Sequence, residues 1–134
     1  MPTAYVTAPP EAAEEIATTV VEERLAACVN QRECRSTYRW SNDEGGDATG
    51  NDAIQHDDEI VLFAKTTTER YDALQARIQE RHPYDVPCIE RFDENGVLDA
   101  YGEWVTDATT PSDATTPSDA TKPSDGDDCG ETTD

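Results

Sequence analysis

The chain has 134 residues and a formal net charge of −20, so one acidic domain is the natural expectation. This excess of negative charge argues against nucleic acid as a partner, because phosphate binding needs a basic face. No stretch approaches the roughly 20 apolar residues that span a bilayer, and no basic region followed by an apolar run opens the chain. We therefore expect a cytoplasmic protein without a membrane partner.

Acidic charge extends along the whole chain, and lysine is nearly absent. Residues 1–106 carry 22 acidic and nine basic side chains, and the only lysines are Lys65 and Lys122. This composition is similar to that of proteins adapted to molar salt, where the Debye length falls to about 3 Å and self-repulsion is screened. We expect a halophilic protein that loses stability at low salt.

The first half of the chain predicts a strand, a helix and the first arm of a hairpin. Residues 4–8 are a β-prone run that ends at a Pro-Pro pair, and a helix follows from Glu11. The apolar stripe of this helix recurs at i+3 and i+4 steps. It comprises Ala13, Ile16, Ala17, Val20 and Val21, with Arg24 and Leu25 closing the last turn. An extended segment over residues 26–40 follows. Its alternation places Cys34, Ser36, Tyr38 and Trp40 on one face.

The second half predicts the other arm of the hairpin and a second helix. Residues 41–58 are rich in Gly, Asp and Asn and predict a long, mobile connection. A nearly continuous apolar run over residues 59–66 predicts a buried strand. The capping-box pattern Thr66-x-x-Glu69 then predicts the start of a helix that runs to about Arg81. A strand over 86–92 follows. The spacing of Leu98, Tyr101 and Trp104 favours a short terminal helix over 97–105, with a final strand piece as the alternative.

The order β-α-β-β-α-β is that of the split βαβ, ferredoxin-like arrangement. We predict an α+β fold with a four-stranded antiparallel sheet and two helices on one face, in a single domain over residues 1–106. Residues 107–134 repeat an Asp-Ala-Thr-Thr-Pro-Ser hexapeptide and contain no Val, Ile, Leu, Met or aromatic residue. They predict an acidic Thr-, Pro-, Ser- and Asp-rich disordered tail, because such a segment cannot offset the entropy of ordering itself.

A histidine and a cysteine lie close together where the second helix ends. His82 is the last residue of the helical stripe, Pro83 cannot continue the helix, and Cys88 follows one turn later, so the two side chains can approach each other. An imidazole and a thiolate suit Cu(I) or Zn(II). The alternatives are that His82 caps helix carbonyls and that Cys88 is a buried strand thiol. We expect the four cysteines to be thiols, as in a reducing compartment.

Six short sequence motifs follow one another along the chain. They are Val6-Thr7-Ala8-Pro9, Leu25-Ala26-Ala27-Cys28-Val29-Asn30, Ser36-Thr37-Tyr38-Arg39-Trp40, Lys65-Thr66, His82-Pro83-Tyr84-x-Val86-Pro87 and Tyr101-x-x-Trp104. In this order they resemble the CutA family of divalent-cation tolerance proteins over residues 3 to about 106. The resemblance implies a ferredoxin-like, PII-like protomer in a homotrimer. It also implies tolerance to and binding of divalent metals, notably copper, and no catalytic activity.

The resemblance also implies roles for individual residues. Tyr38, Trp40, Tyr101 and Trp104 become interface anchors between subunits, since aromatic residues are enriched at interfaces. His82 matches a ligand suggested for copper in some members, whereas Cys88 stands where the family commonly has glutamate and Val6 where some members have cysteine. Lys65 is a possible ligand contact in an intersubunit cleft, or one half of a plain salt bridge.

Three functions are compatible with this sequence. The first is a homotrimeric metal-binding or metal-tolerance protein, whose partners are metal ions such as copper or zinc and copies of itself. The second is a PII-like small-molecule sensor with ligands near Lys65, and the third is a trimer for assembly or partner docking. An enzyme is not expected, because the sequence has no nucleophile elbow or paired-carboxylate signature.

Overall fold

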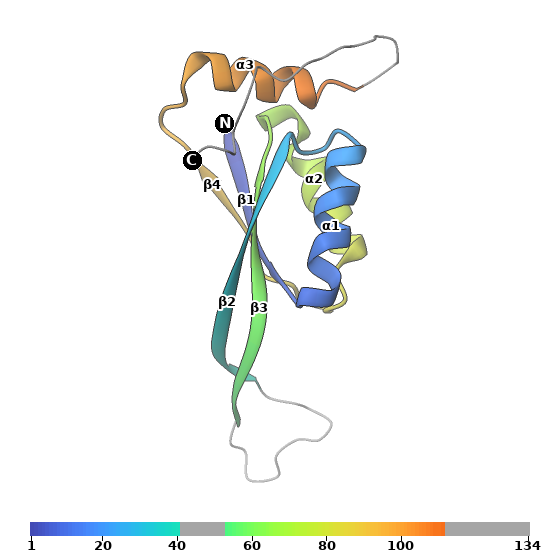
Figure 1. Cartoon of the computed structure of the whole chain (residues 1–134), viewed down its shortest axis with the longest axis vertical. Helices are drawn as coiled ribbons and strands as arrows, with labels where there is room; N and C mark the ends of the chain where they lie inside the picture. The colour runs from blue at the N-terminus through green and yellow to red at the C-terminus, as the bar shows by residue number, and fades with distance from the viewer. Residues whose placement is uncertain (41–52, 112–134) are drawn as a thin grey trace.

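The computed structural model describes residues 1–40 and 53–111. In chain order its elements are β1 (Pro2–Ala8), α1 (Pro10–Glu22), β2 (Cys28–Trp40), β3 (Ala53–Lys65), α2 (Thr68–Arg81), β4 (Ile89–Asp93) and α3 (Asp99–Ala108). The four strands form one antiparallel sheet in the order β2-β3-β1-β4. Helices α1 and α2 cover the same face of this sheet (Figure 1). The predicted α+β, ferredoxin-like architecture is confirmed.

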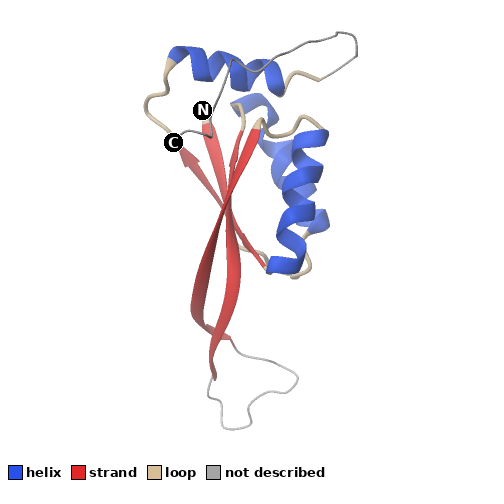
Figure 2. Cartoon of the chain, in the orientation of Figure 1, coloured by secondary structure: helices blue, strands red, loops and turns tan. Residues whose placement is uncertain are grey.

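The hydrophobic core lies between the sheet and helices α1 and α2, which lie together on one side of the strands (Figure 2). Its most buried members are Ala4, Val6 and Ala8 of β1, Ile16 and Val20 of α1, Leu62 and Ala64 of β3, and Leu74 and Ile78 of α2. Each buried Leu or Ile contributes about 1.5–3 kcal/mol. Val21 was predicted to belong to the stripe of α1, but its side chain is 40% exposed. Successive helix residues lie about 100° apart, and Val21 falls beyond the covered arc.

The end of α1 differs from the prediction that Arg24 and Leu25 close its last turn. The helix ends at Glu22, and Arg24 adopts a left-handed conformation with φ of 61°. The backbone N–H of Leu25 then donates to the carbonyl of Val20 at 2.9 Å. This left-handed residue reverses the chain as glycine usually does after a helix, and it returns the Leu25 side chain to the core.

Helix α2 starts without the predicted capping box. Its first residue is Thr68, and Thr67 at the cap makes no side-chain capping hydrogen bond. The Thr66 hydroxyl, which the prediction assigned to the cap, is fully buried and donates to the carbonyl of Leu25 at 2.7 Å. That hydroxyl therefore joins the end of β3 to the chain reversal after α1, which is a tertiary role that a local motif cannot reveal.

Strands β2 and β3 form a long two-stranded hairpin that extends beyond the rest of the sheet (Figure 1). Residues 41–58 were predicted to connect its arms, but β3 already begins at Ala53. Cross-strand contacts explain the difference, since pairs such as Thr37 Oγ1 and His56 Nδ1, 3.0 Å apart, hold a polar strand in register. Residues 41–52 of the predicted connection lie outside the described residues.

Strand β4 begins at Ile89, not at residue 86 as predicted. Pro87 has no N–H to donate to a ladder, and Val86 beside it is 72% exposed. Residues 82–88 therefore form a loop between α2 and β4, and Cys88 lies at the end of this loop.

The terminal element is a helix, as favoured over the strand alternative, and it extends beyond the predicted segment 97–105. It passes residue 106, the predicted domain boundary, and Thr109 after it is only 1% exposed. Residues 112–134 of the predicted disordered tail lie outside the described residues. Within residues 1–40 and 53–111, no helix has the length and apolarity needed to cross a membrane.

Candidate functional site

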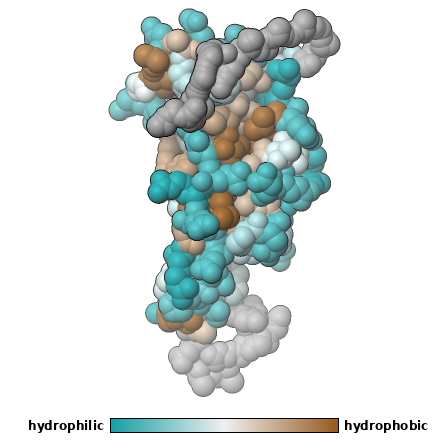
Figure 3. Space-filling model, viewed as in Figure 1, coloured by the Kyte–Doolittle hydropathy of each residue, from teal (hydrophilic) through white to brown (hydrophobic). Residues whose placement is uncertain are grey.

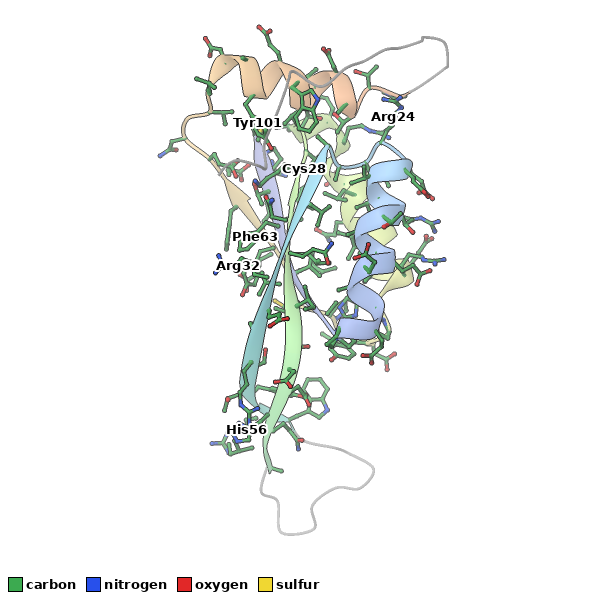
Figure 4. The ribbon with its side chains drawn as sticks, in the orientation of Figure 1. Arg24, Cys28, Arg32, His56, Phe63 and Tyr101 are labelled. Carbon is green, nitrogen blue, oxygen red and sulfur yellow. The ribbon has the colours of Figure 1, made fainter. Side chains whose placement is uncertain are left out.

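The face of the sheet opposite the helices carries aromatic side chains in its centre. Tyr5 on β1 lies between Phe63 on β3 and Phe92 on β4, with ring centroids 5.6 and 5.7 Å apart. The Phe92 side chain is 47% exposed. Figure 4 shows Phe63 and Arg32 on the side of the sheet away from α1. In this chain, an aromatic cluster lies open on the helix-free face.

A pocket with a volume of about 540 Å³ lies on the same face, where the long hairpin leaves the sheet. Its lining residues are Thr7, Ser36, Tyr38, Trp40, Asp57, Glu59, Tyr84, Asp85, Val86 and Cys88. Strand alternation brings the even-numbered residues of β2 and the odd-numbered residues of β3 to one side, as predicted for Ser36, Tyr38 and Trp40. The loop over residues 82–88 supplies the opposite wall. The volume is in the usual range for small-molecule sites.

Glu59 is the most buried carboxylate of the pocket, with only 6% of its surface exposed. Ser36 Oγ donates to one carboxylate oxygen at 2.6 Å, and Tyr84 OH donates to the other at 3.0 Å. A buried charge is costly unless it is hydrogen-bonded, and these two donors reduce that cost. A carboxylate offers about four acceptor positions, and these two donors occupy one on each oxygen. Sequence reasoning missed Glu59, whose only signal was a charge opening an apolar strand.

The two tyrosines of the pocket keep their protons at neutral pH. Burial, and then the hydrogen bond to Glu59, raise the pKa of Tyr84 to about 12. The hydrogen bond to Asp57, followed by burial, also raises the pKa of Tyr38. Both phenols therefore act as donors that orient carboxylates. Among the described residues that line the pocket, three are acidic and none is lysine or arginine, so the pocket is electronegative.

His82 holds the wall of the pocket in place. Its imidazole is 7% exposed, Nε2 donates to the backbone carbonyl of Thr7 at 2.8 Å, and Nδ1 accepts from the backbone N–H of Tyr84 at 3.2 Å. The ring also packs on that of Tyr84, with centroids 4.8 Å apart. Both ring nitrogens thus have protein partners, in a neutral imidazole that carries its proton on Nε2.

Cys88 comes close to the same residue of β1 as His82 does. Burial, and then the charge of Glu90, raise the pKa of the Cys88 thiol, while hydrogen bonds from Thr7 oppose this rise. His82 and Cys88 therefore both contact Thr7. No group of three or more His, Cys, Asp or Glu side chains within residues 1–40 and 53–111 is placed to hold a metal ion. The predicted ligand pair stays a prediction.

The other predicted site residues fall at two ends of the sheet. Lys65 donates to the side-chain carbonyl of Asn30 at 3.1 Å, and it lies six residues along β3 from Glu59, about 20 Å away. Tyr101 and Trp104 pack together on α3, with ring centroids 5.6 Å apart. Tyr38 and Trp40 line the pocket, so the four predicted interface aromatics belong to two separate places, and their interface role stays a prediction.

Three cysteines in the described part of the chain are free thiols, in agreement with the prediction. They are Cys28, Cys34 and Cys88. Cys129 lies outside the described residues.

Comparison with known proteins identifies relatives over nearly all of the described chain. The family model of the CutA1 divalent ion tolerance protein matches residues 3–108. The divalent-cation tolerance protein CutA of Pyrococcus horikoshii is 40% identical over 106 residues, which cover 78% of this chain and 94% of the relative. The protein of the same name from Thermus thermophilus is 36% identical over 100 residues, covering 74% and 87%.

Solved structures agree with this result. The crystal structure of CutA1 from Pyrococcus horikoshii matches with a TM-score of 0.72 at 36% identity, covering 82% of this chain and 99% of that chain. The PII-like protein CutA from a Nostoc species, in its apo form, matches with a TM-score of 0.69 at 31% identity, covering 83% and 99%. These relatives bear tolerance-protein and PII-like names and none that is enzymatic.

Proposed function

This chain belongs to the family of CutA1 divalent ion tolerance proteins, and from that premise we propose that it is a homotrimeric, metal-responsive protein whose pocket receives cations. It is not an enzyme. The observation that carries the proposal is the negative charge of the pocket, whose lining includes Asp57, Glu59 and Asp85 and no lysine or arginine. A site with one sign of charge and low-dielectric walls concentrates counter-ions of the opposite sign.

Self-association is supported by the helix-free face of the sheet. In a monomer the cluster of Tyr5, Phe63 and Phe92 faces water. The outer edges of β2 and β4 also lack a partner strand within the described part of the chain, and unpaired edges favour pairing with another chain. A subunit interface over the cluster of Tyr5, Phe63 and Phe92 covers these rings, and interfaces are enriched in such residues.

Metal uptake is proposed at the loop wall, where His82 and Cys88 both contact Thr7. Imidazole and thiolate suit Cu(I) or Zn(II). A metal ion there replaces a hydrogen bond of His82 and takes the place of the Cys88 proton, so we expect binding that strengthens as the pH rises.

The test is native mass spectrometry of the reduced protein, exchanged from high salt into ammonium acetate, with and without Cu(I) or Zn(II). We expect a trimer that takes up metal in proportion to its subunits and loses that uptake in Cys88→Ala. Phe63→Asp should dissociate the trimer, whereas the control Leu98→Asp, at a 76% exposed residue outside the cluster, should leave it assembled. A monomeric parent protein would overturn the assembly. Metal uptake that survives Cys88→Ala would overturn the site.

The volume of the pocket favours one second candidate, a PII-like sensor of a small molecule. Its electronegative lining disfavours nucleotides and other anionic ligands there, and Lys65 lies too far along β3 to compensate. A thermal-shift screen at high salt separates the two candidates: a shift with nucleotides would favour an anion sensor over cation binding.

A further inference from the structure

The pocket combines aromatic rings with carboxylates in a way that indicates a class of ligand. Trp40 and Tyr38 come from β2, and Tyr84 comes from the loop after α2. In the single chain these three residues are 55%, 38% and 40% exposed, and all three line the same cavity. The faces of aromatic rings attract cations, most strongly in tryptophan.

We infer that this pocket binds a small organic cation with an alkylated ammonium group, enclosed by Trp40, Tyr38 and Tyr84 and balanced by Glu59 and Asp57. This inference rests on the proposed preference of the pocket for cations, and it names the kind of cation. It does not depend on the metal ligands proposed at His82 and Cys88.

The arrangement of the acidic side chains favours an organic cation over a bare metal ion. Asp57 and Glu59 lie two residues apart on β3, yet in the described part of the chain they join no group of three side chains that could coordinate a metal. A large cation with diffuse charge needs no coordination at a fixed distance. It needs apolar contact for its alkyl groups and opposite charge nearby, and the aromatic rings and carboxylates supply these.

The hydrogen bonds of the pocket prepare it for such a ligand. Tyr84 and Ser36 fix the two oxygens of Glu59, and Tyr38 fixes Asp57. Carboxylates that are already oriented lose less freedom when a ligand binds. Figure 3 shows one side of the molecule largely covered by hydrophilic residues.

The experiment compares choline with its uncharged isostere 3,3-dimethylbutan-1-ol by isothermal titration at constant, molar KCl. Both probes have the same shape, so their difference measures the contribution of charge. We expect saturable binding of choline, at least about tenfold tighter than that of the alcohol. Glu59→Gln and Trp40→Leu should each weaken choline binding. The control Asp58→Asn removes a charge from the opposite side of β3, where Asp58 faces Arg35 at 3.6 Å, and should leave affinity unchanged.

The outcomes separate this inference from the proposed function. Equal affinity for choline and the alcohol, or choline affinity that is unchanged in Trp40→Leu, would overturn the organic-cation site. Trp40 was also predicted to be an interface anchor, so Trp40→Leu can change the assembly as well as the pocket. Light scattering on the same samples therefore measures the oligomeric state of each variant. Absent choline binding in a metal-binding trimer would refute the inference alone. Choline binding by a protein that takes up no metal would support it and refute the metal proposal.

Discussion

Replacement of His82 by alanine tests whether this imidazole supports the fold. The change removes the donor to the Thr7 carbonyl at 2.8 Å and the acceptor for Tyr84 N–H at 3.2 Å. A buried acceptor left without its partner costs about 1–3 kcal/mol, and loss of the ring contact with Tyr84 adds about 0.5–1.5 kcal/mol. We expect the free energy of unfolding to fall by about 2–4 kcal/mol.

Urea unfolding followed by circular dichroism, at fixed protein concentration and molar KCl, measures this loss. With a slope of about 2 kcal/mol per M, the midpoint should fall by about 1–2 M. The chain offers a matched control in His56, an exposed histidine near the end of the hairpin whose contact is with Thr37 (Figure 4). His56→Ala should change stability by less than about 0.5 kcal/mol. An unshifted midpoint in His82→Ala, together with lost metal uptake, would refute the structural role.

Two further predictions concern pH and salt. In a titration of tyrosinate absorbance, Tyr84 should ionise near pH 12, and Tyr84→Phe should remove that late step. The pKa of Tyr84 in the folded protein exceeds the ordinary value of 10.0, so the contribution of Tyr84 to stability is complete below pH 10 and is lost as the pH rises toward 12. A normal pKa for Tyr84 would contradict the contact with Glu59. Lowering KCl from 1 M to 0.1 M lengthens the Debye length from about 3 to about 10 Å, so the urea midpoint should fall. A midpoint that is independent of KCl would refute salt adaptation of this acidic surface.

Elements with strong periodic patterns were predictable because their local pattern and their tertiary role agree. The stripe of α1 gives the buried Ile16 and Val20 on the face that meets the sheet. Val21 was misplaced because a helical pattern does not show how wide the covered arc is. The start of β3 at Ala53 was missed because its polar residues pair with β2 across the hairpin, and such long-range pairing leaves little local trace.

The residues of the pocket could be predicted only in part. Tyr38 and Trp40 were placed on one face by alternation, and the same alternation carries them into the pocket. Glu59 and Tyr84 gave no functional signal, since their contact joins residues that are 25 positions apart. Ser36 was placed on the correct face, but its role depends on the burial of Glu59, which only the packed fold determines.

The two cation hypotheses meet at one residue of the loop wall. His82 holds the backbone of Tyr84, and the Tyr84 hydroxyl holds Glu59. A metal ion on Nδ1 of His82 must displace the N–H of Tyr84, and this frees the ring that walls the pocket. A metal ion on Nε2 must instead displace the carbonyl of Thr7 and release the loop from β1. Either displacement weakens the aromatic enclosure, and by thermodynamic reciprocity an ammonium ligand in the pocket opposes the metal to the same degree.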